Sequence, residues 1–177
     1  GRFDEAIAIC RKILEIDPIS PLSYMEMTFA QGMAGRWEEA SETLQKGRMI
    51  DPGNNLMSIA ALFQFARFGW KVEFLKEWEL FTTADSIHAG PMNLAFYVYC
   101  LGTIGNTEEA LTYMNELKHI EQKGNASNTQ MCIAHLGLKN YDKAIDYLAS
   151  AFHEKEFFLV WAKVHWFFDP IRDDPRF

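Results

Sequence analysis

The residues that most often carry metal or acid–base chemistry are scattered along this chain. His153 and Glu154 open the stretch HEKEF, but a zinc-protease helix needs a second histidine four residues after the first, and Phe157 stands there. Cys132 and His135 would share one face of a helix, yet two ligands are too few for a closed zinc site. The five histidines show no metal-ligand spacing among themselves or with cysteine: His88, His119, His135, His153 and His165. We therefore expect no metal and no cofactor, and we interpret Cys132 and His135 as a buried contact within a helical hairpin.

Two acidic pairs and one glycine-rich stretch have simple structural interpretations. Glu38-Glu39 and Glu108-Glu109 fall in the first turns of expected helices, where negative charge favours the positive end of the helix dipole. A catalytic pair of carboxylates is the alternative. The stretch GTIGNT (102–107) lacks the lysine of a phosphate-binding loop and is typical of a turn. The sequence offers no coherent catalytic cluster, so we expect a protein that is not an enzyme.

The composition and net charge argue against some classes of binding partner. The chain has 177 residues, of which 49% are hydrophobic, and its net charge is −7, which argues against nucleic acid. The most apolar stretch, 92–105, is shorter than the roughly 20 residues that span a membrane, and no export leader is visible at Gly1. Three cysteines, Cys10, Cys100 and Cys132, stand among apolar neighbours and are too few and too scattered for a disulfide framework. We expect a cytoplasmic protein that binds neither nucleic acid nor membrane.

The elements that must position these residues are repeated. GRFDEAIAICRKILEIDP begins at Gly1, and GRWEEASETLQKGRMIDP begins at Gly35. Apolar residues recur at helical spacing in both, and both end in Asp-Pro, where the proline disfavours helix in the residue before it. A second apolar-periodic stretch follows each stop, at 22–33 and 56–68, and ends near a glycine. The pattern predicts pairs of helices joined by tight turns.

Two further copies extend the repeat. GNTEEALTYMNELKHI begins at Gly105 and KNYDKAIDYLASAF at Lys139, and the gap before Gly105 has room for a degenerate copy near Gly69. A small residue keeps its register through the clear copies: Ala6, Ala40, Ala110 and Ala144. A small side chain there lets the two helices of a hairpin approach closely. In the degenerate copy Phe74 stands near this position and the connection TTADSIHAGP (82–91) is longer, so we expect its second helix to sit differently.

The in-register copies, with a period of 34 residues, resemble the tetratricopeptide repeat. The resemblance rests on the openings GRFDEA, GRWEEA, GNTEEA and KNYDKA and on the two Asp-Pro steps. It implies an all-α, right-handed solenoid of helix–turn–helix hairpins that ends in a capping helix. The expected segments are a half repeat at 1–18, repeats at about 21–52, 55–86 (degenerate), 91–122 and 125–152, and a capping helix with an aromatic tail at 153–177.

The resemblance also implies where a partner binds. In this family the first helix of each hairpin lines a concave groove that takes extended peptides or partner helices. The register implies a groove lined by Leu22, Met25, Phe29, Met33, Ile59, Phe63, Arg67, Met92, Ala95, Tyr99, Thr129 and Ile133. Methionine and aromatic residues suit an adaptable hydrophobic surface. The Lys and Asn clamp with which some members hold a chaperone's terminal carboxylate is missing, so we do not expect such an adaptor. The alternative is that these side chains pack against neighbouring helices.

The C-terminal stretch carries a second resemblance. WFFDPIRDDPRF (166–177) resembles the ending of many bacterial regulators, in which a tetratricopeptide array follows an adenylate or guanylate cyclase or a winged-helix transcriptional domain. This resemblance, and a start on the second helix of a hairpin, imply a C-terminal fragment of a longer signalling protein.

Aromatic residues are concentrated in the stretch 157–168, which leads into this motif and overlaps its first three residues. We expect them to cap the last hairpin, and a surface for dimerisation or domain docking is the alternative. Arg172 and Arg176 would pair with Asp169, Asp173 or Asp174 and hold the tail against the array.

The sequence thus predicts a non-catalytic scaffold for protein–protein interaction. Its partner would be a peptide, a protein or a signalling domain of its own chain, bound in the concave groove. The alternative is a self-association module, a homo-oligomer that dimerises an upstream cyclase or regulator domain.

Overall fold

The computed structural model describes residues 1–83 and 90–177, and all the regular structure in these residues is helical. The predicted all-α class is confirmed. The chain divides into two compact units, Gly1–Ala84 and Asp85–Phe177. Most of the long connection predicted at 82–91, with His88 in it, lies outside the described residues.

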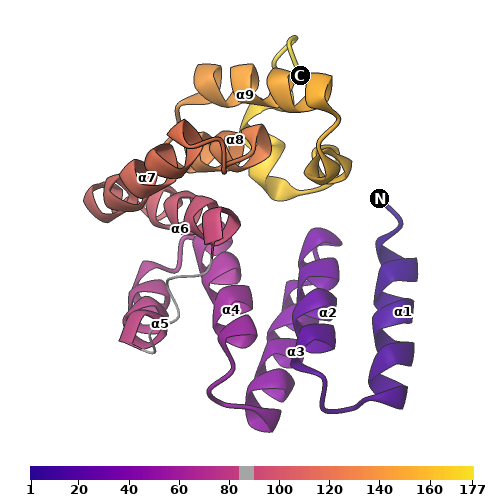
Figure 1. The fold of residues 1–177 in the computed structure, drawn as a ribbon. Coiled ribbons are helices and arrows are strands. Elements are labelled where there is room, and N and C mark those ends of the chain that lie inside the picture. The colour runs from indigo at the N-terminus through magenta and orange to yellow at the C-terminus, as the bar shows by residue number, and fades with distance from the viewer. Residues whose placement is uncertain (84–89) are drawn as a thin grey trace. The chain divides into compact units, whose positions relative to one another are not determined.

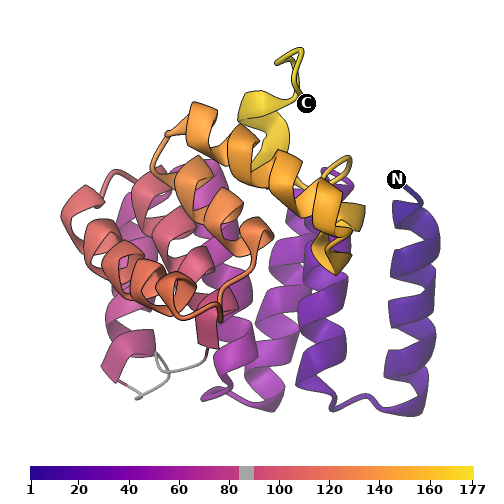
Figure 2. The same cartoon turned by 45° about the horizontal axis from the view of Figure 1, so that its top comes forward.

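The first unit is a consecutive stack of helices. Its elements are α1 (Phe3–Ile16), α2 (Pro21–Met33), α3 (Trp37–Ile50), α4 (Asn55–Phe68) and α5 (Lys71–Thr83). Each packs against the next along the chain, and α2 also packs against α4. Figures 1 and 2 show α1 to α4 side by side. The packing of α2 with α3, and of α4 with α5, gives two hairpins whose first helices are neighbours.

The second unit repeats this arrangement and adds a C-terminal segment that folds back onto it. Its elements are α6 (Gly90–Thr103), α7 (Thr107–Gln122), α8 (Asn128–Gly137), α9 (Tyr141–Glu154) and the 3₁₀ helices η1 (Phe157–Trp161) and η2 (Trp166–Ile171). Helix α6 packs against α7 and α8, and α8 packs against α9. The chain then folds back, so that η2 contacts both α8 and α9.

Helix ends follow the turn chemistry of the sequence. Helices α1 and α3 end at Ile16 and Ile50, directly before the two Asp-Pro steps. Inside the hairpins, Gly35 and Gly105 take φ angles of +75° and +82°, which glycine adopts without steric cost. Lys139 takes a φ of +59° at the same place in the last hairpin, where a side chain makes this conformation cost about 1 kcal/mol.

The repeated alanine lies where paired helices meet. Ala40, Ala110 and Ala144 are each at most 1% exposed. In the degenerate copy Phe74 is fully buried as well, and its ring stacks on that of Trp78 at 6.1 Å. Helix α5 therefore buries an aromatic ring where the clear copies bury a methyl group.

Backbone contact joins α6 and α8. A Cβ atom added to Gly137 would lie 2.2 Å from the Cα of Tyr99, and one added to Gly102 would lie 2.4 Å from the carbonyl oxygen of Gly137. No side chain fits either position unless a helix moves. The two glycines therefore allow α6 and α8, the first helices of the two hairpins in the second unit, to approach this closely.

The C-terminal segment differs from the single capping helix that the sequence predicts. Lys155 ends α9 in the left-handed conformation, with φ +54°, and two short 3₁₀ helices follow. Pro170 lies inside η2, and because proline has no N–H group it favours a short, irregular turn over a continued α-helix. We call residues 156–177 the tail.

Candidate functional site

Cys132 and His135, the pair with potential for metal chemistry, are buried in α8. They are 0% and 3% exposed, and burial raises the pKa of Cys132 to about 12. Burial, assisted by the charges of Lys143 and Lys118, lowers the pKa of His135 to about 4, so its imidazole is neutral at pH 7. Within the described ranges, no group of three His, Cys, Asp or Glu side chains is placed to hold a metal ion.

His135 contributes to helix packing. Its ring stacks on Tyr147 of α9 at a centroid distance of 5.5 Å, and its Nδ1 atom has no hydrogen-bond partner within residues 1–83 and 90–177. The Tyr147 hydroxyl donates a hydrogen bond to Oε1 of Glu121, at 2.7 Å. The predicted buried contact within the last hairpin is confirmed.

The predicted groove residues of the first unit lie on α2 and α4. Leu22 is 54% exposed and Arg67, at the end of α4, is exposed too. The ring of Phe29 meets that of Phe63 edge-on at 5.6 Å, and this contact joins the two helices. Four residues are half-buried: Met25, Phe29, Met33 and Ile59. We call these seven residues the α2–α4 face. Of its apolar members Leu22 is exposed, four are half-buried, and Phe63 is buried at 3% exposed.

The predicted groove residues of the second unit are buried more deeply. Met92 is half-buried, and the exposed fractions of the others are 0% for Ala95, 7% for Tyr99, 1% for Thr129 and 3% for Ile133. These residues occupy the same register in α6 and α8 as the α2–α4 face does in the first unit, since 70 residues separate Phe29 from Tyr99 and Leu22 from Met92. Residues at equivalent positions of the repeat are therefore buried to different extents in the two units.

The tail lies against the first helices of the second unit. The ring of Phe167 is 4.3 Å from that of Tyr99 and 5.8 Å from that of Phe96, and Phe167 is 4% exposed. Phe168 and Ile171 of η2 are buried as well, at 1% and 2% exposed. The η2 part of the aromatic stretch that the sequence assigns to a cap thus packs onto α6 and α8.

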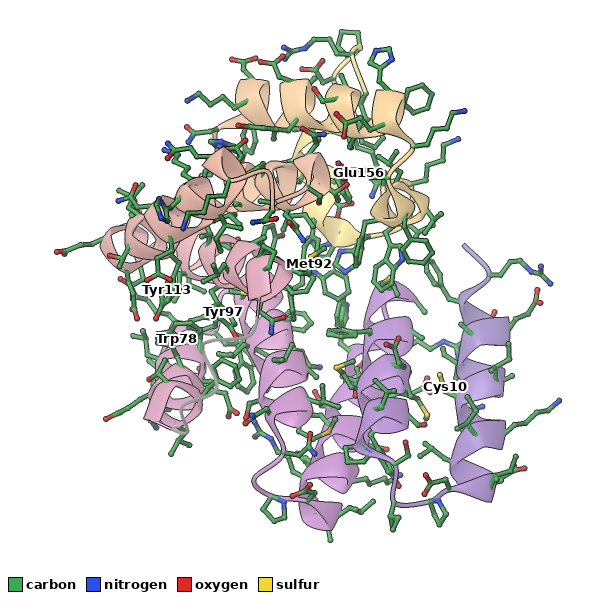
Figure 3. All side chains as sticks on the ribbon, viewed as in Figure 1. Cys10, Trp78, Met92, Tyr97, Tyr113 and Glu156 are labelled. Atoms are coloured by element: carbon green, nitrogen blue, oxygen red, sulfur yellow. The ribbon has the colours of Figure 1, made fainter. Side chains whose placement is uncertain are left out.

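Glu156 fastens the start of the tail to α8, and Figure 3 labels it beside this helix. Its Oε1 accepts hydrogen bonds from the backbone N–H of Asn128 (2.8 Å) and from the Asn128 amide, and its Oε2 accepts from the backbone N–H (2.8 Å) and hydroxyl of Thr129. Burial raises the pKa of Glu156, but these hydrogen bonds outweigh it and hold the pKa below its ordinary value. The carboxylate satisfies N–H groups that have no partner inside the helix.

Sequence reasoning missed Glu156. Its partners lie 27 and 28 residues earlier in the chain, and no local motif connects them. The general preference for a carboxylate at a helix N-terminus was the one signal available, and many acidic residues satisfy it equally well. Thr129, predicted as a groove residue, donates hydrogen bonds to Glu156 from both its backbone N–H and its hydroxyl.

Two arginines secure the rest of the tail. Arg172 donates to the carbonyl oxygens of Ala162 (3.1 Å), Lys163 (2.9 Å) and His165 (2.9 Å), and pairs with Asp169 at 3.1 Å. These bonds close the loop between η1 and η2.

Arg176 pairs with Asp174 and with Asp142 of α9, both at 2.8 Å. The hydrogen bonds from Arg176 lower the pKa of Asp174 to about 2. The predicted pairing with Asp169 and Asp174 is confirmed, and the contact with Asp142 adds a link to the array.

Part of the first unit is similar to a known protein family. Residues 1–62, which span α1 to α3 and the first half of α4, match a family model described as a tetratricopeptide repeat. No curated protein and no solved structure matches the chain. Tetratricopeptide arrays generally mediate protein–protein interaction through the surface that their stacked hairpins form. None of the helices in the described ranges combines the length and the apolar character needed to cross a bilayer.

Proposed function

We propose that this chain is a non-catalytic protein-interaction module and that the α2–α4 face of the first unit binds an extended peptide or a partner helix. The observation that carries this proposal is the partial exposure of an apolar face on two adjacent first helices, with Leu22 at its exposed end. The match to tetratricopeptide repeats covers most of this face. Methionine and phenylalanine side chains adapt to different apolar ligands, which suits recognition of a protein segment.

The second unit contributes to the proposal in a different way. Tyr99 and Thr129 contact the tail, so we assign the main partner contacts to the first unit and a supporting role to α6 and α8. The partner we propose is a protein or a peptide, including a signalling domain of the same polypeptide if the chain belongs to a longer bacterial regulator. The resemblance of WFFDPIRDDPRF to the endings of such regulators supports this context. Three free, buried thiols support a cytoplasmic location.

A peptide array, followed by titration calorimetry of the peptides it selects, tests the proposed face. Phe29→Glu and Leu22→Glu each place a charge on the face and should weaken binding at least about tenfold, the loss expected for a central contact. Val72→Glu is the matched control, because Val72 is 61% exposed on α5 and lies outside the face. Tyr99→Glu is less suitable because it would bury a charge under the tail. Binding that survives both Phe29→Glu and Leu22→Glu would show that the partner does not use this face.

A row of exposed isoleucines on α1 favours a second candidate function. Ile9, Ile13 and Ile16 lie at helical spacing and are 58%, 43% and 86% exposed. A second copy of the chain would cover this row, and the resulting dimer would bring two upstream cyclase or regulator domains together. Light scattering should then give a dimer that Ile13→Lys converts to a monomer. A monomer at high concentration in the unmodified chain would rule this candidate out.

A further inference from the structure

A groove lies within the second unit, away from the α6 and α8 residues of the predicted binding surface. It has a volume of about 830 Å³ and is bounded by α9, by η1 and the residues just after it, and by the end of the tail. Apolar side chains line its floor: Ile145, Leu148 and Ala149 of α9, with Leu159 and Ala162 of the tail. Its volume falls within the range of ordinary ligand-binding clefts, roughly 300–1,000 Å³.

Large apolar side chains at this groove are exposed. Phe152 is 72% exposed, Val160 is 65% exposed and Phe177 is 38% exposed, and all three line the groove. Single exposed apolar residues are common on protein surfaces, but a contiguous group around a cleft marks an interaction site. The floor and the edges of this groove therefore match an apolar ligand.

The charges around the groove are mainly positive. Lys155 and Lys163 line it, and neither ammonium group pairs with a carboxylate in the described part of the chain. Arg176 shares its charge with Asp142 and Asp174. Glu156 is the one acidic residue in the lining that the structure describes, and its carboxylate is engaged by the N-terminus of α8. Two lysines beside an apolar cleft, in a chain of net charge −7, form a local basic edge.

We propose that this α9–tail groove binds an acidic amphipathic helix of a partner protein. A helix that presents a row of apolar residues at intervals of three and four would place them against Leu148, Phe152 and Val160. Glutamate or aspartate residues beside that row would face Lys155 and Lys163. The apolar contacts supply most of the affinity, while exposed lysines set the preferred sign of charge. The proposal is independent of the α2–α4 face.

The test uses a labelled model peptide and the full chain. The probe is a fluorescein-labelled helical peptide of about 16 residues, between four and five turns, with leucines on one face and glutamates beside them. A twin with lysine in place of every glutamate is the control peptide. Fluorescence anisotropy should show the acidic peptide binding at least about tenfold more tightly than its basic twin, with an affinity that falls as salt is added.

Variants locate the peptide. Phe152→Glu, and Lys155→Glu combined with Lys163→Glu, should each weaken binding of the acidic peptide about tenfold or more. Lys118→Glu in α7, combined with Lys123→Glu directly after this helix, makes the same charge change on exposed residues outside the groove and should leave the affinity within about twofold. All these side chains are exposed, so the circular dichroism of each variant should match that of the unmodified chain.

Three results would overturn the proposal. They are equal affinity for the acidic and the basic peptide, no binding of the acidic peptide, and dimerisation that Phe152→Glu abolishes, which would assign the groove to a second copy of the chain. Phe29→Glu should not change the affinity for the acidic peptide. Failure of this groove and failure of the α2–α4 face are therefore distinguishable.

Discussion

Phe29 and Tyr99 hold the same register in two hairpins, 70 residues apart, yet their surroundings differ. Phe29 is half-buried and meets Phe63 of the neighbouring first helix edge-on. Tyr99 is 7% exposed and lies 4.3 Å from Phe167 of the tail. A repeat register determines which residues share a face, whereas segments outside the repeat determine whether that face is open. In this chain the equivalent residues on α2 and α4 are more exposed than those on α6 and α8, with Leu22 at 54%.

The largest effect expected from a single change concerns the tail itself. Phe168→Ala should lower the free energy of unfolding of the second unit by about 3–5 kcal/mol, because Phe168 is 1% exposed and its removal leaves a cavity. Phe157→Ala is the matched control, since Phe157 is 77% exposed, and should change stability by less than about 0.5 kcal/mol. Urea unfolding measures both. Equal effects would mean that the tail is a dispensable cap and that the contrast between the units is wrong.

The close approach of α6 and α8 gives the next largest effect. Gly137→Ala should cost about 3 kcal/mol, because its Cβ would lie 2.2 Å from the backbone of Tyr99 and the helices would have to separate. Gly47→Ala in α3 is the comparison from the first unit. Its Cβ would meet the flexible end of Met57 at 2.3 Å and Tyr24 at 3.0 Å, so about 1 kcal/mol is expected. Thermal unfolding of both variants should show this order, and the reverse order would contradict the described packing.

Acid should weaken the second unit through His135. The pKa of His135 is about 4 in the folded chain and near 6.5 when unfolded, so the unfolded state binds a proton that the folded state does not. Stability should therefore fall as the pH falls from about 6.5 to about 4, by roughly 2–3 kcal/mol. His135→Phe keeps a ring against Tyr147 and should lose this part of the pH dependence. Parallel pH profiles of the two proteins would show that His135 is not buried as described.

The contact between Glu156 and α8 should give the smallest of these effects. Glu156→Gln keeps the shape of the side chain but removes its charge and one acceptor oxygen, and should cost about 1–2 kcal/mol, as for the loss of a helix cap. Glu154→Gln is the control, because Glu154 is exposed one residue before the left-handed turn. Urea unfolding at neutral pH compares the two. Indistinguishable variants would mean that Glu156 does not hold the tail.

Much of the fold could be predicted because its signals are local. The Asp-Pro steps stop α1 and α3, glycine or lysine with positive φ closes the hairpins, and a recurring alanine marks where paired helices touch. The register also identified which side chains of the first helices are equivalent. Each of these features depends on residues within one repeat.

The tail was less predictable because its contacts are distant in the sequence. Phe167 meets Tyr99 and Phe96 about 70 residues away, and Glu156 meets Asn128 and Thr129 nearly 30 residues away. A crowd of aromatic residues indicates burial, but it does not indicate the partner. Tyr99 and Thr129 illustrate this limit. The repeat pattern predicted their positions on the first helices, but it could not predict that the tail covers them.

Amide hydrogen exchange resolved by residue tests the central claim, that the tail covers the first helices of the second unit and that Glu156 caps the start of α8. The first N–H groups of a helix have no partner within it and ordinarily exchange fast. The N–H groups of Asn128 and Thr129 donate to Glu156, whereas that of Leu22, in the first turn of α2, has no acceptor in the described residues. The structure predicts slow exchange at Asn128 and Thr129 and fast exchange at Leu22. Fast exchange at all three would contradict it.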